Sequence, residues 1–314
     1  MEKRKLILFG SNSFIVSLPK SWIEKNNLSK GDLIQINETD NELIINSSNN
    51  NLKKEPQLIT IHVDNKEINI LRTELVSAYL RGYDDITLTG KEINQKIAKL
   101  REIVLKLPGV EIMDLTSTTM RVKNLLNEHS VSIDEIFSRT NNMLLSMIDD
   151  TIKCLEIDIH ESILERDNDV NRMVFLSFRV LRKAINDKKF AQELGISPEK
   201  NLMLWQIFLR LEKIGDYNKR IARIFVQNKI KDKALVKEML LELRKQYLDL
   251  LENYEKNKND KLLLIATNGK LAIIKKCDLF LEKENDYSTF KVIENLKNMS
   301  ASIEQIAQIL LTVM

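Results

Sequence analysis

The run from Asn201 to Gln227 constrains the fold more than any other part of the sequence. Its apolar residues recur at the three-to-four spacing of a helix that turns one face toward a protein core. They are Leu204, Phe208, Leu211, Ile214, Ile221 and Phe225. The sequence therefore predicts a long helix that packs this face against a protein core.

Two carboxylates lie one turn apart in this helix, at Glu212 and Asp216, and Gly215 stands directly before the second. A glycine inside a helix costs about 1 kcal/mol relative to alanine, which suggests a close helix crossing or a ligand near the backbone. Two interpretations remain open. The pair could bind a hard cation or a cluster of transition metal ions, or it could form an ordinary ion-pair network with the basic side chains of Lys213, Lys219 and Arg220.

The stretch L-E-K-I-G-D-x-x-x-x-I-A-R, from Leu211 to Arg223, resembles the signature helix of the PhoU family of phosphate-signalling proteins. The resemblance implies an all-helical pair of three-helix bundles. Some members of that family bind metal clusters through E-x-x-x-D pairs, and Glu212 and Asp216 match such a pair. The resemblance therefore implies a divalent or transition metal ion at the helical bundle as the one candidate cofactor.

Six helices are expected in a PhoU-like domain over residues 130–314, as two antiparallel bundles at 130–230 and 231–314. The expected ranges are Ile133–Cys154, Asp158–Leu194, Pro198–Lys229, Asp232–Lys256, Lys261–Glu284 and Tyr287–Val313. Asp158 is the expected cap of the second helix, and that helix carries an acidic cluster of Glu165, Asp167 and Asp169.

The other copies of the acidic motif are incomplete. On the second helix the matching pair falls at Val174 and Phe178, so the acidic site is either lost, moved toward Asp167 and Asn171, or simply a solvated face. In the second bundle, Lys297 and Ala301 stand where Glu212 and Asp216 stand in the first.

Residues 1–48 show a β-β-α-β-β pattern, with Ser17 as a candidate cap and Gly31 supplying a turn with positive φ. The segment resembles the AbrB/SpoVT swapped-hairpin family at Val16, Pro19, Lys20, Leu28, Gly31 and Asp32. That resemblance implies a homodimer made by interlaced hairpins that binds double-stranded DNA. The basic residues expected to contact phosphates are Lys3, Arg4, Lys5 and Lys20. The alternative is a module that only dimerises.

Between these regions, residues 57–125 follow a polar linker that contains Pro56. Their β-α-β-α-β-β pattern predicts a small two-layer α/β sandwich. The pattern contains no phosphate-binding loop, so a structural module and a ligand-sensing module both remain open. The whole chain is thus expected to be multidomain and mainly α.

The composition excludes several classes of protein. The chain has 314 residues, of which 43% are hydrophobic and 30% charged, with a net charge of +3. No apolar run reaches the roughly 18 residues of a membrane span and no signal-peptide core is visible, so a cytoplasmic location is expected. No nucleophile, base and orienting group occur in a catalytic pattern, so we expect no enzyme.

The sequence therefore predicts a non-enzymatic, phosphate-responsive regulator that binds DNA as a dimer and controls phosphate uptake. The alternative is a PhoU-like adaptor that docks on a phosphate transporter or a sensor kinase at the membrane. In that case the N-terminal domain would serve only for dimerisation.

Overall fold

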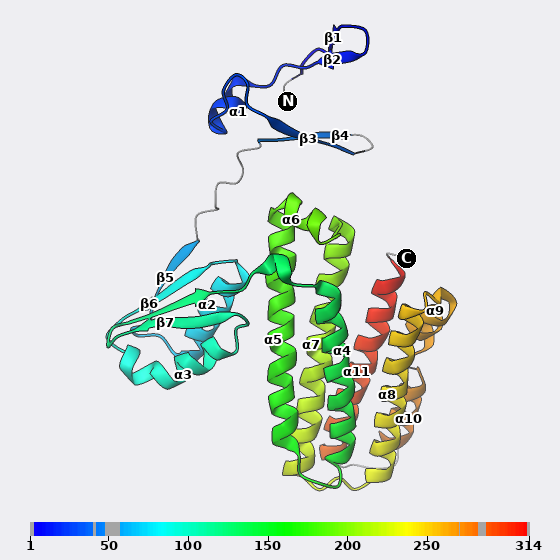
Figure 1. Ribbon diagram of the computed structural model, residues 1–314. Helices are drawn as coiled ribbons and strands as arrows, with labels where there is room; N and C mark the ends of the chain where they lie inside the picture. Colours follow the sequence, from blue (N-terminus) through cyan, green and yellow to red (C-terminus); the bar gives the residue numbers. More distant parts are fainter. Residues whose placement is uncertain (1–2, 40–41, 48–56, 270, 282–286, 313–314) are drawn as a thin grey trace. The chain divides into compact units, whose positions relative to one another are not determined.

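The computed structural model describes residues 3–39, 42–47, 57–269, 271–281 and 287–312. Contacts within the chain divide it into two compact units, Met1–Pro56 and Gln57–Met314, which we treat separately (Figure 1). Most of the predicted linker, residues 48–56, lies outside the described residues.

The first unit consists of two antiparallel hairpins and one short helix. The bounds are β1 (Ile7–Phe9), β2 (Ser13–Ile15), α1 (Lys20–Lys25), β3 (Ile34–Thr39) and β4 (Glu42–Ser47). Pro19 precedes the helix in an extended conformation, as its fixed φ favours. The expected cap at Ser17 is wrong, because the helix has no side-chain cap and the Ser17 hydroxyl instead accepts a hydrogen bond from Arg4.

The turn between α1 and β3 confirms the expected role of Gly31, whose φ is +98°. An L-residue is disfavoured at such an angle, whereas glycine adopts it freely. The Asp32 carboxylate accepts a hydrogen bond from the Ser29 backbone N–H at 2.7 Å and closes the turn. Just before it, the side chain of Leu28 is buried.

The second unit begins with an α/β module in the expected order. Its elements are β5 (Leu58–His62), α2 (Ile68–Leu80), β6 (Asp85–Thr89), α3 (Ile93–Leu105), β7 (Val110–Leu115) and β8 (Thr119–Asn124). The strands form one sheet in the order β5-β6-β8-β7, with β5 and β6 parallel and the other neighbours antiparallel. Leu71, Leu75 and Leu100 pack from the helices against Leu88 and Val122 of the sheet.

The helical region follows a short 3-10 turn. Its helices are α4 (Ile133–Lys153), α5 (His160–Asn186), α6 (Lys188–Glu193), α7 (Pro198–Gln227), α8 (Lys233–Glu255), α9 (Asn259–Asn268), α10 (Leu271–Leu281) and α11 (Tyr287–Leu311). Ser197 caps α7 by accepting a hydrogen bond from the Lys200 N–H, with Pro198 in the first turn, where proline is tolerated best.

Two expected helices are divided in the structure. The second breaks at Asp187, whose carboxylate accepts a hydrogen bond from the Phe190 N–H and so begins α6 as a new helix. That helix was also expected to start at Asp158, but its cap is Ile159, and Asp158 accepts a hydrogen bond from the His160 N–H. The fifth expected helix appears as α9 and α10, on either side of residue 270.

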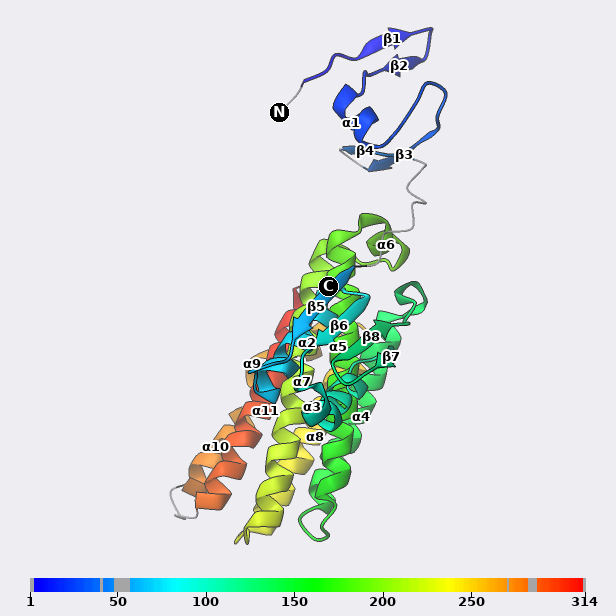
Figure 2. The same ribbon diagram turned by 90° about the vertical axis from the view of Figure 1, so that its left-hand side faces the viewer.

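One continuous apolar core joins the two halves of the helical region, α4–α7 and α8–α11. Helix α7 contacts α4, α5 and α11, and α11 in turn contacts α8, α9 and α10 (Figures 1 and 2). Leu211, Ile214 and Ile221 of α7 are buried in the same cluster as Leu296 and Ile303 of α11. The predicted apolar face of α7 is therefore covered by helices from both halves.

Arg179 of α5 joins the α/β module to the helices. Its guanidinium is 3% exposed and donates to the backbone carbonyls of Tyr79 at 2.8 Å and Tyr83 at 3.1 Å, where α2 ends. It also pairs with Glu128 at 2.8 Å and Asp84 at 3.1 Å. Burial alone would raise the pKa of Glu128, but Arg179 and Lys183 outweigh it and hold that pKa below its ordinary value.

We expect replacement of Arg179 by methionine to lower the free energy of unfolding of the full chain by about 3–5 kcal/mol, because Glu128 would lose the buried partner of its charge. The measurement is urea denaturation followed by circular dichroism. Arg182→Met, at an exposed position of the same helix, is the matched control and should change little. Equal losses in the two variants would contradict this role of Arg179.

Candidate functional site

The predicted pair on α7 forms the centre of a cluster of charged side chains between α5 and α7. Glu212 and Asp216 lie on one face of α7, and both are partly buried. Asp167 reaches the same place from α5, which packs along α7. We call Asp167, Glu212, Asp216, Lys213, Lys219 and Arg220 the α5–α7 cluster.

Lys219 bridges the two helices in this cluster. Its Nζ lies 2.6 Å from Oδ2 of Asp167 and 2.7 Å from Oδ1 of Asp216, so one ammonium group donates to carboxylates of both helices. Asn171 adds a weaker contact by donating to Oδ2 of Asp167 at 3.3 Å. The interpretation of the α5 acidic residues as a solvated face fails for Asp167, which is 4% exposed, and holds for Glu165 and Asp169, which are exposed.

Burial and pairing act on these groups in opposite directions. Burial raises the pKa of Asp167 above its usual range, and the nearby Lys219 offsets this only in part. For Lys219, burial by itself would lower the pKa, but the hydrogen bonds to Asp167 and Asp216 outweigh it and raise the pKa. Lys219 is therefore held as an ammonium ion between the two carboxylates.

The remaining basic groups balance the remaining acidic ones. Lys213 lies 2.9 Å from Glu212 and 3.7 Å from Asp216, and Arg220 lies 3.6 Å from Asp216. Three carboxylates thus face three basic side chains. Within the described part of the chain, no group of three or more histidine, cysteine, aspartate or glutamate residues is placed to hold a metal ion. The geometry matches the ion-pair interpretation of the sequence.

The second set of helices places a lysine where the first has its glutamate. Lys297 of α11 lies 3.2 Å from Asp278 of α10 and bridges neighbouring helices. Lys276 of α10 similarly contacts Glu238 at 2.8 Å and Glu242 at 2.5 Å on α8. Lysine–carboxylate pairs between helices therefore occur in both halves of the helical region.

Gly215 lies at the crossing of α5 and α7, as its position in the motif suggested. A β-carbon built on it would meet Oδ1 of Asp167 at 3.4 Å and side-chain atoms of Leu144 and Val170 at 3.5 Å. These are ordinary contact distances, so the crossing has room for one methyl group but not for a larger side chain.

We expect Gly215→Ala to keep the fold and to raise the free energy of unfolding by up to about 1 kcal/mol, because alanine favours a helix over glycine. Gly215→Leu should lower it by about 1–3 kcal/mol through overpacking. Thermal and urea denaturation of both variants would measure the difference. A strongly destabilised alanine variant would show that the crossing needs a bare backbone.

The residues expected to contact DNA lie in the first unit. Lys3, Arg4, Lys5 and Lys20 are all exposed. Arg4 donates to the Ser17 hydroxyl at 3.3 Å, across the first hairpin, and Lys20 forms a loose pair with Glu24 at 3.6 Å. These side chains are thus available at the surface, and their use in DNA binding remains a prediction.

The hairpins of this unit expose apolar side chains on both faces. Successive residues of a strand point to opposite faces, yet Ile7, Leu8 and Phe9 are 59%, 61% and 65% exposed. Phe14 of β2 and Ile36 of β3 are also exposed. A single copy of the unit leaves most of its large apolar side chains in contact with water.

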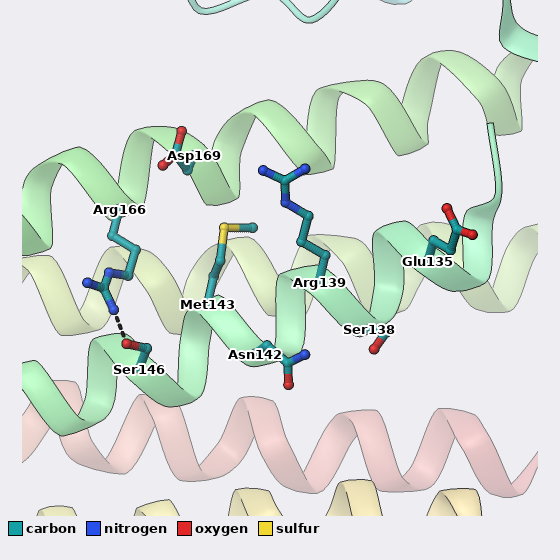
Figure 3. Close-up of a pocket in the computed structure, with 8 residues that line it drawn as sticks. All are labelled: Glu135, Ser138, Arg139, Asn142, Met143, Ser146, Arg166 and Asp169. Atoms are coloured by element: carbon teal, nitrogen blue, oxygen red, sulfur yellow. Dashed lines mark hydrogen bonds between the residues drawn. The ribbon is translucent and has the colours of Figure 1, made fainter. Parts of the chain in front are cut away.

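A groove runs along the surface between α4 and α5, with a volume of about 540 Å³ (Figure 3). Figure 3 shows Arg166 reaching from α5 to the Ser146 hydroxyl and Arg139 pointing from α4 toward α5. Arg166 also pairs with Asp150 at 3.1 Å, whereas Arg139 is exposed. The sequence patterns considered above did not predict this groove. Arg139 and Arg166, on the polar faces of two neighbouring helices, were the residues that could have indicated it.

The carboxyl ends of the parallel strands β5 and β6, where α/β proteins often bind ligands, are closed by internal bonds. Asp64 accepts a hydrogen bond from the Glu92 N–H at 2.9 Å, and the backbone N–H groups of Glu92 and Lys91 lower its pKa. Lys96 donates to the Lys66 carbonyl at 2.6 Å. This arrangement favours the structural interpretation of the module.

In the described part of the chain, no helix has the length and apolar character needed to cross a membrane. Each long helix has a polar face, so its mean hydropathy is too low for a membrane span.

Comparison with known proteins gives two similarities. Residues 7–53 match a family model described as antidote-toxin recognition MazE, bacterial antitoxin. The crystal structure of PhoU from Pseudomonas aeruginosa has a similar fold, with a TM-score of 0.51 and 13% sequence identity, over 58% of this chain and 94% of that one. No curated protein matches the chain significantly.

The chain thus joins a MazE/AbrB-like N-terminal segment to a mainly helical region with the PhoU fold. Both resemblances that the sequence motifs indicated are confirmed. At this level of identity the likeness to PhoU concerns the fold alone.

Proposed function

We propose that this protein is a non-enzymatic, phosphate-responsive regulator that acts as a homodimer and binds double-stranded DNA through its N-terminal unit. The observation that carries the proposal is the exposure of apolar side chains on both faces of the N-terminal hairpins. The MazE/AbrB-like match over the same residues supports it.

We infer dimerisation because most of the large apolar side chains that the structure describes in the N-terminal unit are exposed. Burying one leucine or phenylalanine side chain contributes about 1.5–3 kcal/mol, and a two-stranded hairpin is at best marginally stable in water. A second copy that inserts its hairpins between these strands would cover both exposed faces. The α/β module and the helices have their own buried cores and do not need this partner to fold.

DNA binding is the interpretation that fits the basic residues of the same unit. Lys3, Arg4 and Lys5 lie directly before β1, and a dimer that places both copies on one face would present a basic surface to DNA. Contacts to phosphates would release counterions and make the affinity depend on salt. The PhoU-like region would then carry the phosphate response of the regulator.

We expect Leu8→Asp to convert the full-length dimer to a monomer, because a carboxylate would lie in the apolar contact between copies. Multi-angle light scattering after size-exclusion chromatography measures the change in mass. Leu241→Asp, at an exposed leucine of α8, is the matched control and should leave the mass unchanged. A dimer that survives Leu8→Asp would contradict assembly through the N-terminal hairpins.

Binding to DNA is tested by fluorescence anisotropy with the upstream region of its own gene at two salt concentrations. We expect the affinity of the wild-type dimer to fall as salt rises, with a slope of about 0.9 for each phosphate contacted. The triple replacement of Lys3, Arg4 and Lys5 by alanine should weaken binding and flatten that slope. Lys25→Ala with Lys30→Ala removes exposed charge elsewhere in the unit and serves as control.

The adaptor is the second candidate function, and the groove between α4 and α5 is the observation that favours it (Figure 3). Residues of both α4 and α5 line it, and the exposed Arg139 offers a positive charge for recognition of a partner. If the folded dimer does not bind DNA even at low salt, the DNA-binding proposal is refuted. An adaptor for a phosphate transporter or a sensor kinase would then be the function to test.

A further inference from the structure

The metal ion implied by the PhoU resemblance can be compared with the side chains that would hold it. Divalent and transition metal ions take carboxylate oxygens whose lone pairs point into a shared site. Here Asp216 already accepts from Lys219 at 2.7 Å, and Lys213 and Arg220 lie within 3.7 Å and 3.6 Å of it. The donor set therefore does not fit a metal ion.

The ammonium group of Lys219 has the position of a bridging cation. It lies between carboxylates of two different helices, at 2.6 Å from Asp167 and 2.7 Å from Asp216. Both carboxylates are largely shielded from water, with side-chain exposures of 5% and 16%. Two such carboxylates would repel each other without a positive charge between them.

The remaining oxygen of Asp167 is not turned toward the charged cluster. Oδ1 is buried without a hydrogen-bond partner. It lies beside Gly215, and side-chain atoms of Leu144 and Val170 surround the same point. This oxygen thus faces the helix crossing, where the neighbouring side chains that the structure describes, Leu144 and Val170, are apolar and cannot bind a metal ion.

We infer that Lys219 is a built-in cation, which holds the α5–α7 cluster together in place of the metal ion that the fold family suggests. The chain supplies the positive charge itself. The inference concerns the PhoU-like region only and does not depend on DNA binding. In the second half of the helical region, Lys297 occupies the position that corresponds to Glu212 and pairs with the exposed carboxylate of Asp278.

The first test measures metal. Full-length protein is incubated with Mn²⁺, Fe²⁺ or Zn²⁺, desalted and analysed by mass spectrometry of the elements. We expect less than stoichiometric metal and a melting temperature unchanged by the ions or by EDTA. Stoichiometric metal that is lost in Asp167→Asn would overturn the inference. This result does not depend on how any lysine variant folds.

The second test removes the charge of Lys219. Lys219→Met keeps most of the side-chain stem and should lower the melting temperature by about 5–10 °C, because Asp167 loses its ammonium partner and Asp216 loses its nearest one. Lys213→Met is the matched control from the same cluster, where the more exposed lysine should matter little. Adding Asp167→Asn to Lys219→Met should restore part of the loss, since the two effects are coupled.

Equal melting temperatures for Lys219→Met and Lys213→Met would overturn the role of Lys219. A double variant less stable than the sum of its single changes would also count against it. Recovery by Asp167→Asn supports a charge interaction between these two residues rather than a general loss of packing.

Discussion

The burial of α7 is the constraint on which the helical region depends. Its apolar side chains contact α4 and α5 on one side and α11 on the other, within one continuous core. Polar groups on such a helix have to find partners inside the protein. Asn218 does so by accepting a hydrogen bond from Thr151 at 3.0 Å, and Asp216 does so through Lys219. The charged cluster is thus a product of the same packing that forms the bundle.

The contacts of Arg179 hold the α/β module and the helices of the second unit together. One guanidinium satisfies two carbonyls at the end of α2 and two carboxylates, and it packs over the ring of Tyr79 at 5.0 Å. If Arg179 moved away, the two carbonyls and Glu128 would each lose a hydrogen bond in a partly or fully buried place, which costs free energy. The α/β module is therefore fixed to α5 rather than attached by a flexible tether.

Much of this fold could be predicted from periodicity and turn residues. The start of α7 at Pro198 and the turn at Gly31 follow from local chemistry that the sequence displays directly. The break at Asp187 was missed because an aspartate can also lie inside a continuous helix. It ends one helix and caps the next only when the following segment packs in another direction, which the sequence does not show. Arg179 gave a usable signal, since it is the one charged residue in the mostly apolar stretch from Val174 to Leu181. The bridge from Lys219 to Asp167 could not be predicted, because it depends on the register between two helices.

The ion pairs of α7 also differ from a metal centre in how their components are supplied. A metal ion has to be acquired from the cell, and its occupancy follows the supply and the oxidation state of the metal. A lysine is incorporated during translation, always once per chain and always beside the same carboxylates. The inferred role of Lys219 thus implies that this region is complete as soon as it has folded and that its stability does not depend on the supply of metal.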